Sequence, residues 1–309
     1  MKISSHTRSN ELPEKAQPVR ELSQNCHWQS QVCHGESERR NTQVFCFVNQ
    51  KGGVGKSSSC FHLAGAYAAQ GLSVLIIDTD PQGSISQGFF GSESVEQLPP
   101  DVTVAALFAS DWNFRNWNAL IHETRFAGIH VCPANQGLAE FNTPRPEDAG
   151  PVQYALREFL DEQTAYDIVL IDCPPNLYRC TWTAMVAADW VIIPLTPEDF
   201  GTQGLRAVHQ AVEHAQLLNT NLLKLGHLVT RSDGRLLVHK HYERRLRKRY
   251  GDLVLDNFLP ELSDFKLAVA NRSPVQSYRR RSRAARLTQN LSREILDRTH
   301  GSTKGQRAA

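Results

Sequence analysis

Long apolar runs are missing from this chain of 309 residues, although hydrophobic residues make up 40% of it. The longest such stretches, for example residues 184–195, are interrupted by a charged side chain, here Asp189. They fall short of the ~18 apolar residues that a membrane-spanning helix needs. The sequence therefore predicts no transmembrane helix, whereas its length and composition suit one α/β domain with a core of about 250 residues.

Cysteines with the spacing of a metal site or of a disulfide framework are also lacking. The seven cysteines are scattered, and the Cys-His pairs at 26–27 and 33–34 match no familiar zinc pattern. Residues 1–43 are polar and contain no apolar segment of the kind found in a signal peptide. An odd cysteine count without such a signal favours a reducing, cytoplasmic location. We expect residues 1–41 to be disordered, because so polar a segment cannot bury enough apolar surface to fold.

A glycine-rich loop with two lysines lies between an apolar run at 44–48 and a helix-like stretch at 60–69. A strand that passes through glycines into a helix is the context of a phosphate-binding loop, whose N–H groups converge on phosphate oxygens. In such a loop Lys56 would reach the β- and γ-phosphates, and the Ser57 hydroxyl would ligate Mg²⁺. The pattern predicts a nucleoside triphosphate as the ligand, held by Gly52, Gly53, Val54, Gly55, Lys56, Ser57 and Ser58.

Two further apolar runs, at 73–78 and 167–172, read as buried strands that end in carboxylates. Asp78 and Asp80 follow the first run, and Asp172 ends the second. Ligands of open parallel sheets bind at the carboxyl ends of the strands, so these acids and the loop are expected to face one nucleotide. An acid at a strand end can instead cap the next turn, and this alternative is strongest for Asp78. The order of these segments predicts an α/β fold with a mostly parallel β-sheet flanked by helices on both faces.

The run 51–57, with its extra lysine, resembles the deviant phosphate loop of the ParA/MinD ATPases and, more narrowly, of ParA/Soj-type DNA partition ATPases. The resemblance covers about residues 42–298. It implies that Lys51 reaches across a dimer to the nucleotide of the partner. The chain departs from the usual patterns in three places. Gln50 stands where a strict phosphate loop has glycine, and Ser57-Ser58 replaces Thr-Thr but keeps the hydroxyl that Mg²⁺ requires. Residues 261–266 stand where relatives carry a more basic loop, so no DNA contact is assigned there.

The same resemblance assigns roles to the acids. Asp80 is expected to polarise the attacking water and to help position Mg²⁺, whereas Asp172 is expected to hold a Mg²⁺-bound water. Asp78 is expected to be structural. The implied catalytic residues are thus Lys51, Lys56 and Asp80, and the implied metal site consists of Ser57, Asp80 and Asp172.

The family resemblance also implies a function and partners. It implies an ATPase that forms a homodimer when it binds ATP and hydrolyses ATP weakly until a partner protein stimulates it. Non-specific DNA and a ParB-like centromere-binding adaptor are the expected partners, in the partition of plasmid or chromosomal DNA. The expected location is cytoplasmic and associated with the nucleoid, and no membrane partner is expected.

A strong overall charge is lacking, since the chain carries a net charge of only +2, but cations gather near its C-terminal end. Residues 231–286 contain 15 lysines and arginines against 6 acids. Such a cluster suits phosphate backbones and gives binding that is independent of sequence and weakens with salt. A solvated helix face is the alternative. The resemblance implies DNA binding in this region, and the candidate contacts are Arg235, Arg244, Arg245, Arg247 and Lys248.

The remaining pattern predicts one ATPase domain over residues 42–299, followed by a flexible tail at 300–309. The last clear strand is predicted at 225–230, and the resemblance places the nucleotide base near its end, beside Thr230 and Arg231. The Pro-rich stretch 142–151 is predicted to be a loop without a strand or helix. A final helix is predicted over 279–299.

Two other functions remain open. A MinD-like or other cargo-positioning ATPase could end in an amphipathic membrane helix, but the final helix carries a single apolar stripe that is predicted to dock on the sheet. A DNA-binding autorepressor would need a specific reader helix, and residues 1–43 show no helix-turn-helix pattern. The apolar stripe of the predicted final helix consists of Leu287, Leu291, Ile295 and Leu296.

Overall fold

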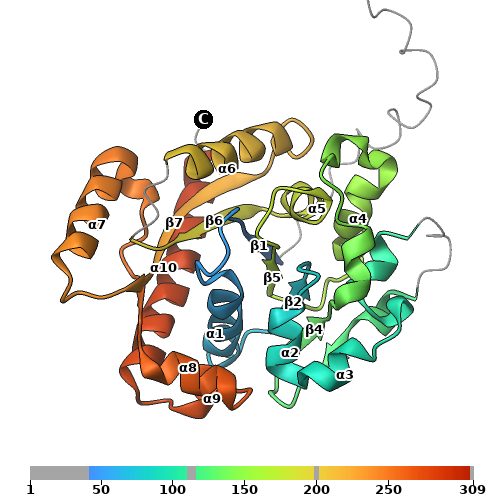
Figure 1. Cartoon of the computed structure of the whole chain (residues 1–309), viewed down its shortest axis with the longest axis horizontal. Helices are drawn as coiled ribbons and strands as arrows, with labels where there is room; N and C mark the ends of the chain where they lie inside the picture. The colour runs from blue at the N-terminus through green and yellow to red at the C-terminus, as the bar shows by residue number, and fades with distance from the viewer. Residues whose placement is uncertain (1–41, 110–115, 198–201, 307–309) are drawn as a thin grey trace, which may run out of the picture. The chain divides into compact units, whose positions relative to one another are not determined.

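An eight-stranded β-sheet forms the centre of the computed structural model, which describes residues 42–109, 116–197 and 202–306 (Figure 1). The strand order is β3-β4-β2-β5-β1-β6-β7-β8. Among the described strands only β3 is antiparallel to its neighbour, so the predicted mostly parallel α/β fold is confirmed. The strands are β1 (Gln43–Phe47), β2 (Val74–Asp78), β3 (His122–Glu123), β4 (Ile129–Cys132), β5 (Ile168–Asp172), β6 (Trp190–Leu195), β7 (Leu223–Ser232) and β8 (Leu259–Pro260).

Alternating residues of the central strands face two separate hydrophobic cores. Val44 and Cys46 of β1 face the first core, and Phe45 and Phe47 face the second. Both faces are therefore apolar, which explains why these strands read as continuous hydrophobic runs. The first core is covered by α4 (Ala155–Asp161), α5 (Arg179–Ala187) and α6 (Thr202–Ala215), and the second by α1 (Lys56–Ala68), α2 (Ser84–Phe90), α8 (Ser263–Ala270), α9 (Val275–Tyr278) and α10 (Arg283–Gln306).

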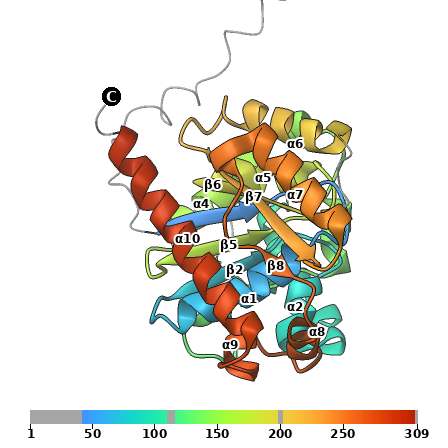
Figure 2. The same ribbon diagram turned by 90° about the vertical axis from the view of Figure 1, so that its left-hand side faces the viewer.

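Helix α7 (Leu237–Tyr250) lies at the edge of the molecule beside β7, away from both main cores (Figures 1 and 2). It contributes Leu246 to a third, small cluster with Leu195 and Val229. Most of its basic surface consequently remains exposed. The remaining elements are α3 (Ser92–Glu96) and short 3-10 helices at Pro100–Val102, Val104–Leu107, Trp117–Leu120, Gln136–Glu140, Pro146–Tyr154 and Gly251–Leu253.

Register brings the predicted site residues to one edge of the sheet. Asp78 of β2 and Asp172 of β5 are direct partners in the parallel ladder, and Phe47 of β1 pairs with Asp172 on its other side. The loop after β1 and the two strand-end acids therefore lie at the same edge. From β1 the chain runs through α1 to β2, which lies on one side of β1 in the sheet, whereas β6 lies on the other side of β1. The loops at this edge therefore lie at a topological switch point of the sheet.

Several predicted boundaries were wrong. The last strand was predicted at 225–230, but β7 runs from Leu223 to Ser232 and is followed by β8, whose two residues are too short to leave a pattern. The stretch 142–151 was predicted to lack helix, yet 3-10 turns begin at Pro146, where the fixed φ of proline suits a first helical position. The final helix was predicted to begin at residue 279, but α10 begins at Arg283, after the separate short helix α9 has ended at Tyr278.

The C-terminal helix continues to Gln306, beyond the predicted domain end at Thr299. Its Leu291 and Ile295 are buried in the second core, and Leu296 packs against it, so docking is confirmed for three of the four residues of the predicted apolar stripe. Leu287 is half-buried and is not among the residues of this core. No helix of the described residues combines the length and apolar character needed to cross a membrane. The predictions made for residues 1–41 lie outside the part of the chain that the structure describes.

Candidate nucleotide-binding site

The loop between β1 and α1 takes its shape from two glycines. Gly53 has φ +75 and Gly55 has φ +82, in the left-handed region that residues with a side chain rarely adopt. Gly55 is the N-cap residue of α1 and provides no side-chain cap for the first turn. The N-terminal N–H groups of a helix need acceptors, and an anion can supply them. The loop thus presents a ready anion-binding site at the start of α1.

Lys56 lies buried beneath this loop, with 6% of its surface exposed. Its Nζ donates to the backbone oxygens of Asn49 and Lys51, each at 3.2 Å. Burial lowers the pKa of Lys56, and the negative charges of Asp172 and Asp80 act against that decrease. The two acids are therefore electrostatic neighbours of the lysine, as the sequence pattern predicted.

Asp172 is completely buried, and neither of its carboxylate oxygens has a hydrogen bond of good geometry to any described residue. Burial raises the pKa of Asp172 well above the usual range, and the nearby charge of Asp78 raises it further. The Ser57 hydroxyl is close enough to oppose this increase. An unsatisfied buried carboxylate is costly unless a cation or a donor compensates it. With Ser57 and Asp80 nearby it forms an oxygen-rich set of the kind that Mg²⁺ prefers.

Asp78, by contrast, is fully hydrogen-bonded. Its Oδ1 accepts from the Asp80 N–H at 3.1 Å, and its Oδ2 accepts from the Ser86 N–H at 3.0 Å and the Ser86 hydroxyl at 2.6 Å. Burial raises its pKa to about 7. These contacts fix the start of α2 and the loop that carries Asp80, in agreement with a structural role for Asp78.

Asp80 itself is 8% exposed, and its Oδ1 accepts from the Gln82 N–H at 3.0 Å. Burial raises its pKa, while the Gln82 N–H and the charge of Lys56 lower it. Asp80 thus has a fixed position next to the lysine and retains access to solvent. Such a carboxylate can orient a water molecule beside a bound phosphate.

Three residues that hold the loop were not assigned to it in the sequence analysis. The side-chain amide of Asn49 donates to the Pro194 carbonyl at 2.7 Å, and its Oδ1 accepts from the Lys51 N–H at 3.0 Å. Its position two residues before Lys51 is an Asx-turn signal that could have identified it. Thr230 and Arg231, which were expected beside the base, contact the loop itself.

The Thr230 hydroxyl donates to the Val54 carbonyl at 2.7 Å and lies 3.1 Å from the Leu195 carbonyl. Arg231 Nη1 donates to the Gly53 carbonyl at 3.0 Å. The end of β7 therefore holds two successive peptide groups of the loop. No sequence signal points to these contacts, because they join residues far apart in the chain.

The predicted loop residues differ in exposure. Val54 and Lys56 are buried, Gly55 and Ser57 are half-buried, and Lys51 is exposed together with Gly52, Gly53 and Ser58. The fold brings the residues 52–58, Asp80 and Asp172 together at one edge of the sheet. An exposed Lys51 is accessible to a second molecule.

The predicted DNA contacts divide into two groups. Arg235 pairs with Asp233 at 2.7 Å, and Arg247 pairs with Glu243 and Asp256 at 3.1 and 3.2 Å. Arg247 also donates to the Leu255 carbonyl, so that it ties α7 to the following segment. The second group is exposed on α7 and comprises Arg244, Arg245 and Lys248.

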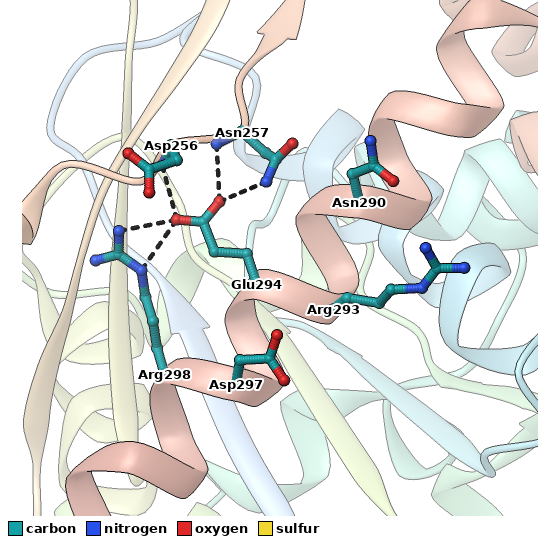
Figure 3. Close-up of a pocket in the computed structure, with 7 residues that line it drawn as sticks. All are labelled: Asp256, Asn257, Asn290, Arg293, Glu294, Asp297 and Arg298. Atoms are coloured by element: carbon teal, nitrogen blue, oxygen red, sulfur yellow. Dashed lines mark hydrogen bonds and ion pairs between the residues drawn. The ribbon is translucent and has the colours of Figure 1, made fainter.

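A surface hollow elsewhere has a structural role. It lies along α10 and the segment before β8, and Glu294 is its centre (Figure 3). The Glu294 carboxylate accepts from the N–H groups of Asp256 and Asn257, both at 2.7 Å, and from Arg298 Nε at 3.0 Å. The bonds from Asp256 and Asn257 join α10 to the segment before β8, and the bond from Arg298 lies within α10.

A glycine loop between a strand and a helix, a buried lysine beneath it and acids at neighbouring strand ends define a P-loop nucleotide-binding protein. Residues 42–224 match the AAA_31 family, described as an AAA domain. The chain is 31% identical to the chromosome-partitioning ATPase Soj of Treponema pallidum, over 83% of this chain and 98% of that protein. It is 32% identical to the chromosome partitioning protein ParA of Caulobacter vibrioides, over 83% and 94% of the two chains. The chain therefore belongs to the AAA_31 family, as a ParA/Soj-type member.

A solved structure supports the fold assignment. It is cobyrinic acid a,c-diamide synthase from Mycobacterium smegmatis with a bound ATP analogue and magnesium, which is 26% identical to this chain. The TM-score is 0.69, and the match covers 82% of this chain and 94% of the other. A protein with the same fold thus binds an adenine nucleotide together with magnesium.

Proposed function

We propose that this chain is an ATPase that binds ATP with Mg²⁺, hydrolyses it slowly and uses the cycle to partition plasmid or chromosomal DNA. The observation that carries the proposal is the arrangement around Lys56, which lies buried under the loop beside Asp80 and the unsatisfied carboxylate of Asp172. The relatives named for chromosome partitioning and the related structure with an ATP analogue and magnesium support it.

Each residue of the site has a task in this proposal. The loop N–H groups and Lys56 hold the phosphates, and Lys56 exchanges the carbonyls of Asn49 and Lys51 for phosphate oxygens. Ser57, Asp80 and Asp172 would hold Mg²⁺, directly or through water. The ion would neutralise charge on the transferring phosphoryl group. Asp80 orients the attacking water.

Lys51 links nucleotide binding to dimerisation. Its backbone is fixed by Asn49 and Lys56, whereas the residue is exposed. In the proposed ATP-bound homodimer, the Lys51 side chain reaches the nucleotide of the partner, so that closing the dimer completes each catalytic site. Slow turnover follows, because hydrolysis waits for a closed dimer and for a stimulating protein.

Non-specific DNA is the proposed binding partner, and a ParB-like centromere-binding adaptor is the protein proposed to stimulate ATP hydrolysis. The exposed cations Arg244, Arg245 and Lys248 of α7 would contact the DNA backbone, and Arg235 next to them would join once it leaves Asp233. Arg247 would contribute positive charge to this surface but no direct contact with DNA, because ion pairs with Glu243 and Asp256 hold its side chain. A cytoplasmic, nucleoid-associated location belongs to this proposal.

The alternatives receive less support. In a MinD-like positioning ATPase the C-terminal helix would bind a membrane, but the apolar side chains of α10 pack against the second core. A role as an autorepressor would need base-specific contacts, and the exposed basic side chains of α7 suit phosphates instead.

The decisive experiment measures binding to a random-sequence DNA duplex over a salt series. We expect tight binding with ATP, weak binding with ADP, and persistent binding by Asp80→Ala with ATP, because that variant closes the dimer without hydrolysis. The affinity should decrease steeply with salt. A lack of DNA binding in every nucleotide state would contradict the partition function and favour another cargo.

A further inference from the structure

Arg231 occupies an unusual position between the nucleotide loop and the segment after β8. Its Nη1 donates to the Gly53 carbonyl at 3.0 Å, and its Nε donates to Glu261 Oε2 at 2.9 Å. Glu261 also forms an ion pair with Lys266 of α8. One guanidinium group therefore joins the loop to a carboxylate that is 30 residues further along the chain.

The backbone of Arg231 is strained to make these contacts. Its φ is +51, and among the described residues Arg272, with φ +50, is the one other non-glycine residue with a positive φ. Such a conformation disfavours any residue with a Cβ, and it persists where surrounding contacts or function require it. A glycine would adopt it without strain, so an arginine at this position indicates that its side chain is needed.

The contact with Gly53 sets the direction of an N–H group. A trans peptide is planar, and its C=O and N–H point in opposite directions. Because Arg231 holds the Gly53 carbonyl, the N–H of Val54 points to the other side of the loop. The hydroxyl of Thr230 holds the Val54 carbonyl in the same manner and so directs the N–H of Gly55.

We infer that Arg231 is a positioning residue for nucleotide binding, which orients the Gly53–Val54 peptide so that its N–H faces the phosphates, with Glu261 orienting the guanidinium. The inference rests on the nucleotide-binding function proposed above. It links the phosphate loop to the Glu261–Lys266 ion pair, so that the conformation of this C-terminal segment affects how tightly the loop holds a nucleotide.

The test compares Arg231→Gly with Arg272→Gly, each assayed for Mg·ADP binding by calorimetry and for denaturant unfolding without nucleotide. Both substitutions remove the same backbone strain, but Arg272 is not among the residues that contact the loop. We expect the unfolding midpoint to stay the same or increase in both variants. The Kd for Mg·ADP should increase about tenfold in Arg231→Gly, as for the loss of a charge-assisted hydrogen bond, and remain unchanged in Arg272→Gly.

Two further variants separate the side chain from the backbone. Arg231→Met keeps the Cβ and should raise the Kd as Arg231→Gly does. Glu261→Gln should raise it about threefold in the wild-type background and have no further effect in Arg231→Gly. An unchanged Kd in Arg231→Gly and Arg231→Met, or an equal increase in Arg272→Gly, would overturn the inference. An equal effect of Glu261→Gln in both backgrounds would refute the orienting role of Glu261.

The wild-type chain provides the remaining control. If it binds no Mg·ADP and no fluorescent ATP analogue, the proposed function itself fails, and the inference fails with it. If it binds both and Arg231→Gly binds them equally well, only the positioning role of Arg231 fails.

Discussion

The hydroxyl of Thr230 donates to the carbonyl of Val54 across 2.7 Å and joins the end of β7 to a loop 176 positions earlier in the chain. The same hydroxyl lies 3.1 Å from the Leu195 carbonyl at the end of β6. One buried side chain thus connects two strand ends to the nucleotide loop, whose geometry depends on tertiary structure as well as on its glycines.

Replacing Thr230 with valine should loosen this connection. Valine has nearly the same shape but no hydroxyl, so the Val54 carbonyl loses its donor. We expect the free energy of unfolding to decrease by about 1–3 kcal/mol and the affinity for Mg·ADP to decrease as well. Urea denaturation and calorimetry would measure the two effects. Thr230→Ser keeps the hydroxyl and should behave like the wild type, and equal losses in both variants would contradict the role of the hydrogen bond.

The two lysines of the loop should have separable effects. Lys56→Ala should weaken ATP binding by about 100-fold or more, because the buried cation under the loop is lost. Lys51→Ala should leave the Kd of a monomer for ATP within about threefold, but it should prevent the ATP-dependent dimer and reduce turnover roughly 10²-fold or more. Equilibrium nucleotide binding, light scattering and phosphate release distinguish these outcomes. Normal dimerisation of Lys51→Ala would exclude the action of this lysine in the partner's site.

Stability without nucleotide should decrease as the pH rises from about 4 toward the folded-state pKa of Asp172. Burial raises the pKa of this carboxyl group in the folded chain above its value in the unfolded chain. The folded state therefore binds more protons in this range, and the free energy of unfolding decreases by at most about 1.4 kcal/mol per pH unit for one such group. Denaturant unfolding between pH 5 and 8 would measure the slope.

Asp172→Asn provides the corresponding variant. It should flatten the pH dependence and raise stability at pH 8, because a neutral amide replaces a buried charge. It should also weaken the effect of Mg²⁺ on nucleotide affinity. Asp101→Asn, a substitution of an exposed acid, should leave both properties unchanged. An identical slope in wild type and Asp172→Asn would show that other groups cause the pH dependence.

A charge reversal on α7 should weaken DNA binding without changing nucleotide affinity. Arg244→Glu should lower the affinity for a random duplex, and the slope of log K against log salt should decrease by about 0.9 for the lost phosphate contact. Arg145→Glu is the matched control, because Arg145 is exposed and precedes the 3-10 helix that leads into α4. Helices α4 and α7 lie on opposite sides in Figure 1. Similar losses in both variants would indicate a general charge effect instead of a contact.

The sequence predicted the central strands, the loop and the acids at the strand ends because each of these features is local. The apolar runs that end in Asp78 and Asp172 and the glycines before Lys56 determine strands, a turn and a helix start over few residues. The short strand β8 and the 3-10 turns after Pro146 were missed, because two paired residues or a single turn leave no periodicity to detect.

By itself the sequence determined the phosphate-binding chemistry: glycines that permit a positive φ, a lysine and a serine at the start of a helix, and carboxylates at two strand ends. Tertiary structure decided which groups hold this site in place and what electrostatic environment they create. Parallel pairing set Asp78 beside Asp172 and left the second acid buried without a hydrogen bond of good geometry from any described residue. Because β7 passes next to the loop, Thr230 and Arg231 form hydrogen bonds to the loop carbonyls. Such contacts depend on distances across the folded sheet, and no local sequence pattern records those distances.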